Sequence, residues 1–152
     1  MPKKNATPNV KFNDPDFLKR IRFAKLAEGD PILNYFYSLL EVPGYSLFER
    51  AYMDTVIPPN IVSVGWKHYT GQLNDQIPIL AFDDSAVITV YVTISNANDD
   101  LIEEGYALPT ETGDYWYYNV SAENSAIEGC SITVEATDLP ENTTTQTFRI
   151  PA

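Results

Sequence analysis

Residue types that build catalytic and metal sites are scarce in this chain of 152 residues, which contains one cysteine, Cys130, and one histidine, His68. A single cysteine excludes an internal disulfide, and one histidine with one cysteine leaves too few ligands for a zinc or other transition-metal site. With 7 glycines in total, the chain also has no glycine-rich phosphate loop. We therefore expect no cofactor of these kinds.

The usual catalytic arrangements are missing as well. His68 lies in a polar segment, and no elbow-type serine motif occurs in the chain. Glu103 and Glu104 are adjacent on a predicted strand, so they point to opposite faces and cannot flank one glycosidic bond. We interpret this pair as part of a solvated edge strand, and Cys130 as a small buried or half-buried side chain. The sequence predicts a protein that is not an enzyme.

Long apolar runs are absent too. No segment approaches the roughly 18 apolar residues that a membrane-spanning helix needs. Residues 1–9 start with charge but have no apolar core segment, so we expect no secretory signal there. The sequence leaves the location open, with an extracellular or virion assembly as our expectation.

Charge is segregated along the chain, whose formal net charge is -11. Residues 1–25 hold seven basic and two acidic side chains, a net charge of +5. Residues 26–152 hold three basic and nineteen acidic side chains, a net charge of -16. Because an acidic body repels phosphates and anionic lipids, any contact with nucleic acid would have to use the first 25 residues.

Helix start signals are concentrated in the first third of the chain. Asp14 and Asp30 each precede a proline, which is the pattern of a capping residue followed by proline at the first helical position. Ser46 and Glu49 have capping-box spacing. Such short helices need a packing partner. The expected ranges are 1–13 for an extended arm and 14–57 for a helical segment, with helices over 15–27, 31–40 and from 46 onward.

Residues 60–152 alternate apolar and polar side chains with the period of a half-buried strand, most clearly at 86–95. Seven such segments separated by turn signals predict a mainly β protein, a seven-stranded antiparallel Ig-like sandwich preceded by the three short helices. The expected strands are 61–66, 76–82, 86–95, 101–107, 115–122, 131–137 and 143–150. The expected inward side chains are Val62, Val64, Trp66, Ile77, Ile79, Ala81, Ile88, Val90, Val92, Ile94, Trp116, Tyr118, Val120, Ile132, Val134, Ala136, Phe148 and Ile150.

Two segments resemble bacterial Ig-like repeats. Residues 131–138 (Ser-Ile-Thr-Val-Glu-Ala-Thr-Asp), with Asn142 and a threonine-rich last strand after them, resemble the closing segment of such a repeat, and residues 75–94 resemble its B and C strands. The resemblance covers about residues 60–150 and departs at Glu141, where the family usually has glycine. It implies a sandwich that serves as a spacer, an adhesive module or a decoration on surface structures and virions.

Acidic turns form one candidate site. An Ig-like strand order would bring the loop after the second strand and the loop after the sixth to the same end of the sandwich. Carboxylate and amide oxygens gathered on turns are the ligands that Ca²⁺ prefers. The alternative is that each side chain accepts hydrogen bonds within its own turn. The candidate calcium ligands are Asp83, Asp84, Asp138, Glu141 and Asn142, which have no EF-hand spacing.

Aromatic side chains form a second candidate. Alternation directs Tyr115 and Tyr117 outward, and together with Tyr91 on another strand they could make a patch that stacks on a glycan or contacts a protein. The alternative is ordinary cross-strand pairing on an exposed face.

The basic segment at 17–25 is the third candidate. It combines cationic and apolar side chains, which fits docking on the acidic face of a neighbouring copy or on its own sandwich. A helix-turn-helix interpretation is weaker, because no later helix carries the basic and amide side chains of a recognition helix. The candidate interaction residues are Lys19, Arg20, Arg22, Lys25, Phe17, Ile21 and Phe23.

These observations predict a structural or assembly subunit that forms a homo-oligomer or joins a larger assembly, such as a bacterial surface filament, an appendage or a virus-like particle. The alternatives are an adhesive module that binds glycan or calcium, and a protein that binds nucleic acid through its basic N-terminus.

Overall fold

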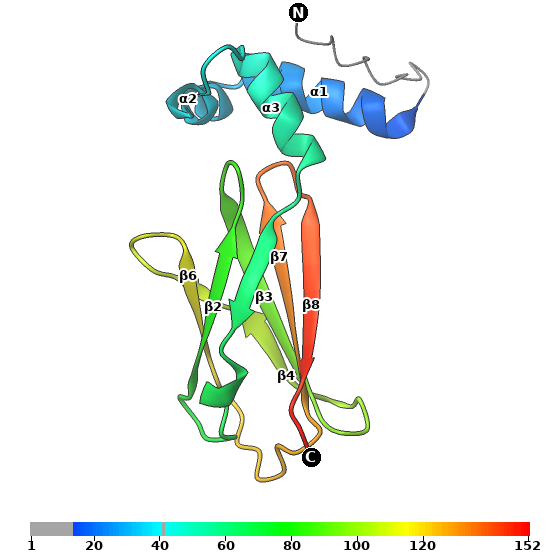
Figure 1. Ribbon diagram of the computed structural model, residues 1–152, viewed down its shortest axis with the longest axis vertical. Helices are drawn as coiled ribbons and strands as arrows, with labels where there is room; N and C mark the ends of the chain where they lie inside the picture. The colour runs from blue at the N-terminus through cyan, green and yellow to red at the C-terminus, as the bar shows by residue number, and fades with distance from the viewer. Residues whose placement is uncertain (1–13, 41) are drawn as a thin grey trace, which may run out of the picture. The chain divides into compact units, whose positions relative to one another are not determined.

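The computed structural model describes residues 14–40 and 42–152 (Figure 1). The chain divides into two compact units, Met1–Val56 and Ile57–Ala152. The extended arm expected at residues 1–13 lies outside the described residues. No described helix is long and apolar enough to cross a lipid bilayer.

The described part of the first unit consists of three helices, α1 (Pro15–Gly29), α2 (Pro31–Leu39) and α3 (Leu47–Val56). All three positions agree with the predicted start signals. Helix α1 continues two residues further than expected, because no residue before Gly29 interrupts it.

The predicted caps are present at the helix starts. Asp14 accepts a hydrogen bond of 3.0 Å from a backbone N–H two residues later, and Asp30 accepts two such bonds of 2.9 Å. Ser46 and Glu49 form the reciprocal capping box, with the Ser46 N–H donating to Glu49 Oε2 at 2.6 Å and the Glu49 N–H donating to Ser46 Oγ at 3.1 Å. These bonds satisfy backbone donors that the first turn of a helix leaves unpaired.

Tyr37 lies at the centre of the first unit. Its ring is fully buried and meets Phe23 and Phe36 edge to face, with centroid distances of 6.1 and 5.3 Å. Its hydroxyl donates to Asp54 Oδ2 at 2.5 Å, and its carbonyl accepts from Arg50 Nη1 at 3.1 Å. One aromatic side chain on α2 is thereby tied to both other helices.

The second unit is mainly β and contains two four-stranded antiparallel sheets. Their strand orders are β1-β2-β6-β5, called here the β2 sheet, and β4-β3-β7-β8, called here the β3 sheet. The bounds are β1 (Asn60–Val64), β2 (Gln76–Phe82), β3 (Val87–Ser95), β4 (Leu101–Tyr106), β5 (Leu108–Pro109), β6 (Tyr115–Asn119), β7 (Ser131–Asp138) and β8 (Thr143–Arg149).

Three elements differ from the seven expected strands. The strand expected at 115–122 is shorter, since β6 ends at Asn119. The segment expected as one strand at 101–107 leaves the β3 sheet after Tyr106, and Leu108–Pro109 then pairs with β6 in the β2 sheet. The switch occurs at Ala107, whose N–H donates to Val90 O at 2.8 Å. The first expected strand ends early, because Trp66–His68 forms a 3-10 turn, η1.

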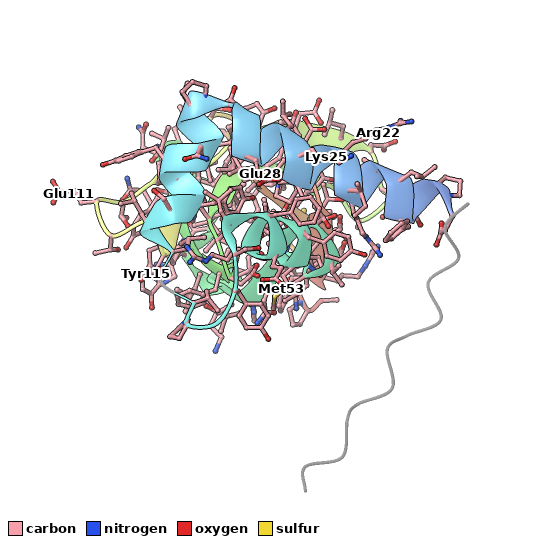
Figure 2. All side chains as sticks on the ribbon, turned by 90° about the horizontal axis from the view of Figure 1, so that it is seen from above. Arg22, Lys25, Glu28, Met53, Glu111 and Tyr115 are labelled. Carbon is pink, nitrogen blue, oxygen red and sulfur yellow. The ribbon has the colours of Figure 1, made fainter. Side chains whose placement is uncertain are left out.

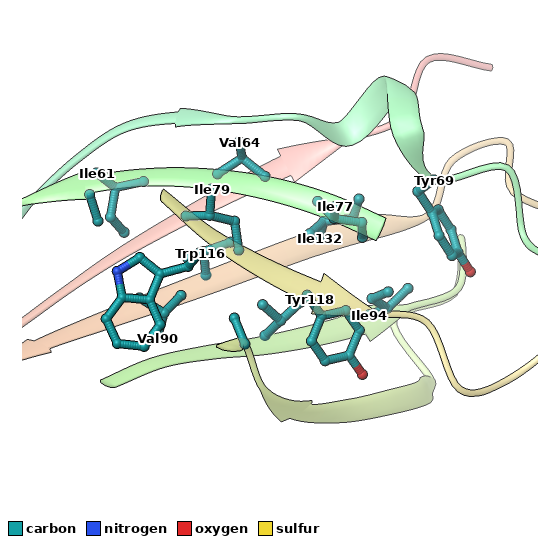
Figure 3. Packing of buried hydrophobic residues seen from close by; sticks show 14 of the residues in the cluster. Ile61, Val64, Tyr69, Ile77, Ile79, Val90, Ile94, Trp116, Tyr118 and Ile132 are labelled. Atoms are coloured by element: carbon teal, nitrogen blue, oxygen red, sulfur yellow. The ribbon is translucent and has the colours of Figure 1, made fainter. Parts of the chain in front are cut away.

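The core lies between the sheets and takes side chains from both (Figure 3). Most expected inward residues are buried, and Trp66 and Phe148 are partly buried against the core. Val62 and Ile88 were expected inside but are 51% and 45% exposed. The buried apolar cluster comprises Ile61, Val64, Tyr69, Ile77, Ile79, Ala81, Val90, Val92, Ile94, Ala107, Trp116, Tyr118, Val120, Cys130, Ile132, Val134, Ala136 and Ile150.

Both exceptions come from irregular pairing. The register between β1 and β2 shifts between Ile61 and Ser63, so Ile61 rather than Val62 faces the core. The register between β3 and β7 shifts between Val87 and Thr89, where Ile88 turns outward. A β-bulge adds a residue on one strand and thereby breaks the strict alternation on which the prediction depended.

The first and last strands of the unit lie side by side at their starts. Thr144 Oγ1 donates to Pro59 O at 2.5 Å, which links the residue before β1 to the beginning of β8. Both strands then run the same way, so the chain enters and leaves this unit at opposite ends (Figure 1).

Candidate interaction site

The first candidate surface is the basic side of α1, formed by Lys19, Arg22 and Lys25. All three side chains are exposed, and their spacing of three residues keeps them on one side of the helix. Figure 2 shows Arg22 and Lys25 along α1, with Glu28 further on. Within residues 14–40 and 42–152 none of the three forms an ion pair or a hydrogen bond. Arg20, the fourth predicted cation, is half-buried.

The apolar residues predicted to accompany these cations have another position. Phe17, Ile21 and Phe23 are all half-buried, and the Phe17 ring meets Tyr52 of α3 edge to face at 6.3 Å. These three side chains therefore pack within the first unit itself. The apolar side chains that α1 exposes are Leu18 and Leu26, at 41% and 57%.

The second candidate surface is a groove of about 620 Å³ on the outer face of the β3 sheet. Tyr91 and Tyr106 are cross-strand partners, and their rings meet edge to face at 4.9 Å. Glu135 pairs with Tyr91 on the other side, and Glu141 approaches from the β7–β8 turn. Threonines of β3, β7 and β8 complete the lining. We call this feature the tyrosine–glutamate groove.

Negative charge at this groove is unbalanced. Neither Glu135 nor Glu141 forms an ion pair with any described residue. A third carboxylate, Glu104, lies beside Tyr91. Burial raises the pKa of Tyr91, and the Glu104 charge and hydrogen bond raise it further.

The predicted aromatic patch is wrong in its composition. Tyr115 and Tyr117 are exposed on β6 in the β2 sheet, whereas Tyr91 belongs to the β3 sheet. The partner of Tyr91 is Tyr106, which sequence reasoning missed. Pairing residues outward from the turn at 96–100 without an irregularity would place Gly105 opposite Tyr91. The register between β3 and β4 shifts by one residue between Ile94 and Ser95, and this shift brings Tyr106 opposite Tyr91.

The acidic loops do meet at one end of the second unit. Asp83 and Asp84 follow β2, and their charges help raise the pKa of Asp138, at the end of β7, to about 6, after burial as the main cause. Asn142 donates from its backbone N–H and from Nδ2 to the two Asp138 carboxylate oxygens, at 2.6 and 3.0 Å. Asp83 Oδ2 accepts from the N–H and hydroxyl of Ser85 at 3.2 and 2.8 Å. These bonds are the turn interactions weighed against calcium binding, and the calcium site stays a prediction.

The last acidic residue of that prediction, Glu141, has an unusual backbone. Its φ is 70°, in the left-handed region that glycine adopts with least strain. This is the position at which the chain departs from the Ig-like pattern. The Glu141 side chain lines the tyrosine–glutamate groove.

Glu103 was predicted to be solvated and is instead 7% exposed. Its Oε1 accepts from the Tyr118 hydroxyl at 2.8 Å, the Ser121 N–H at 2.9 Å and the Ser121 hydroxyl at 3.2 Å. Its Oε2 accepts from the Ala122 N–H at 3.0 Å. Burial raises the pKa of Tyr118, and Glu103 raises it further. A carboxylate on β4 therefore holds β6 and the segment after it.

The single histidine and the single cysteine differ in their exposure to solvent. His68 is exposed at the end of η1. Cys130 is fully buried, as expected, and its thiol donates to Ala126 O at 3.3 Å.

Comparisons with known proteins give no family for this chain. No protein-family model and no curated protein matches the sequence. Among solved structures, an engineered protein matches with a TM-score of 0.41 and 14% identity, over 74% of this chain and 29% of its own. A lipoprotein from Bacteroides thetaiotaomicron matches with a TM-score of 0.33 and 14% identity, over 63% of this chain and 79% of its own. Both similarities are too low to carry an argument about function.

Proposed function

We propose that this protein is a non-catalytic assembly subunit, an Ig-like module that docks on a neighbouring copy through its basic N-terminal helical arm. The observation that carries the proposal is the basic side of α1, where Lys19, Arg22 and Lys25 face solvent without an ion-pair partner in the described part of the chain. A surface filament, an appendage or a virus-like particle is the kind of assembly it would join.

The strand order supports the Ig-like part of the proposal. Ig-like sandwiches place their A, B, E and D strands in one sheet and C, F and G in the other. The orders β1-β2-β6-β5 and β4-β3-β7-β8 correspond to A-B-E-D and C′-C-F-G. In this correspondence the short β5 is the D strand.

Charge supports the docking part. Residues 57–152 contain two basic and fourteen acidic side chains. A cationic helix side in one copy and an anionic β unit in the next attract each other at long range. Because the two surfaces differ, the contact is heterologous and adds further copies unless rotation closes a ring.

The test is sedimentation velocity of the full chain at about 20 mM and about 500 mM salt, since added salt screens exposed charges. We expect dimers and larger species at low salt and mostly monomers at high salt. The variant Lys19→Gln/Arg22→Gln/Lys25→Gln should stay monomeric at both. The control Lys67→Gln/Gln72→Glu/Asn98→Asp changes the net charge equally at exposed positions and should associate as the parent does. A parent chain that is monomeric at low salt contradicts the proposal.

A further inference from the structure

We propose that the tyrosine–glutamate groove is the acceptor for the basic side of α1 from a second copy of this chain. This inference rests on the proposed assembly function and names the surface that the cationic helix would occupy.

The charge of the groove calls for a cation from outside its own unit. Glu135 and Glu141 line it and Glu104 lies beside Tyr91. The only two basic residues of residues 57–152 are engaged elsewhere. Arg149 pairs with Asp99 at 2.9 Å, and Lys67 lies over the Trp66 ring at 5.7 Å.

The aromatic lining adds affinity for the same class of group. Arginine and lysine bind the faces of tyrosine rings, and arginine also forms forked hydrogen bonds with carboxylates. Tyr91 lies directly between Tyr106 and Glu135 across the strands. An arginine such as Arg22 would meet a ring and a carboxylate within one strand spacing. The Thr89, Thr137 and Thr143 hydroxyls can accept from further cationic donors.

The length of the groove matches the length of the exposed side of α1. The groove extends from β4 across β3 and β7 to β8, three strand spacings or about 14 Å. The exposed side of α1 between Leu18 and Leu26 spans a rise of about 12 Å. Its three cations span the middle of that length, and the two leucines at its ends supply apolar contact that charge alone lacks.

The experiment mixes two full-length variants that each keep one half of the contact. The groove variant, Glu135→Gln/Glu141→Gln/Tyr91→Ser, keeps the basic helix, and the helix variant, Lys19→Gln/Arg22→Gln/Lys25→Gln, keeps the groove. Each alone should lose at least about tenfold in association constant at low salt. An equimolar mixture should form dimers that do not extend, because one complementary pair remains. The control Glu111→Gln/Glu128→Gln, with the same loss of acidic charge at exposed sites, should stay within about twofold of the parent.

The outcomes separate the two proposals. A groove variant that associates like the parent, while the helix variant does not, overturns the groove and leaves the assembly function standing. A mixture that stays monomeric overturns the pairing of these two surfaces. A parent chain that is monomeric at low salt overturns both. Glycan-array binding that depends on Tyr91, with unchanged self-association, assigns the groove to a sugar instead. Circular dichroism of both variants verifies that they fold.

Discussion

The two sheets of the second unit share one core and differ on their outer faces. None of the strand residues of the β2 sheet is charged, and its outer face exposes Val62, Phe82, Tyr115 and Tyr117. The β3 sheet carries Glu104, Glu135 and Arg149 among threonines. The inner faces of both follow the same burial requirement, so they inform about fold. The outer faces are free to differ, so they inform about contacts with other molecules.

The largest expected effect on stability comes from removing the hydrogen bonds of Glu103, which join the two sheets. Glu103→Leu leaves the Tyr118 hydroxyl and the N–H groups of Ser121 and Ala122 without their acceptor. We expect the free energy of unfolding to fall by about 2–4 kcal/mol, because the buried Tyr118 hydroxyl and two part-buried N–H groups would lose their acceptor. Urea unfolding followed by tryptophan fluorescence measures the change.

The matched control for this prediction is Glu104→Leu, the adjacent and exposed carboxylate. It should change the free energy of unfolding by less than about 0.5 kcal/mol. If both variants lowered the free energy of unfolding equally, the inter-sheet hydrogen bonds of Glu103 would not be the source of the loss.

An intermediate effect is expected for the pH dependence of the unfolding free energy. It arises from the β3 sheet, because the strands of the β2 sheet contain no carboxylate. The pKa of Asp138 is raised to about 6 in the folded state, mainly by burial and further by Asp83 and Asp84. Between about pH 4 and 6 the folded protein therefore binds more protons at this site than the unfolded chain. Its contribution to stability is complete below about pH 4 and is lost as the pH rises through 6.

Asp138→Asn should remove this dependence. The difference in unfolding free energy between variant and parent should change by at most about 3 kcal/mol from pH 4 to pH 7, in favour of the variant at pH 7. Urea titrations at several pH values measure it. A constant difference across this range would contradict a raised pKa of Asp138.

The smallest effect concerns the uncharged outer face. Phe82→Lys places a charge among exposed apolar side chains and should change the free energy of unfolding by less than about 0.5 kcal/mol. It should also reduce any association that survives at about 1 M salt, where charge attraction is screened and apolar contact persists. Light scattering at high salt measures this, with Thr145→Lys on the β3 sheet as the matched control. A reduction by both variants would mean that the β2 sheet is not the source.

The sequence predicted those features that depend on neighbours along the chain. The caps at Asp14, Asp30, Ser46 and Glu49 are local, and so is the alternation that buries residues such as Ile77 and Val90. These local signals predict the three helices and most of the strands, whereas the assignment of each strand to one of the two sheets depends on contacts between distant segments.

The predictions that were wrong concern features that depend on pairing between distant segments. A bulge moves Val62 outward without any mark in local alternation. Glu103 is buried only because the segment at 118–122 offers it four donors. Tyr91 meets Tyr106 rather than Tyr115 or Tyr117 because the chain changes sheets after β4. The segregation of charge along the chain follows directly from the sequence. The tyrosine–glutamate groove could not be predicted in that way, because it depends on which residues pair across β3, β4 and β7.

The side-by-side start of β1 and β8 has a mechanical consequence. The chain enters the β unit at one end and leaves at the other, with Thr144 bonded to Pro59 O where the two terminal strands begin. A pull on both ends would load the hydrogen bonds of these strands in parallel, and many must break together before either strand peels away.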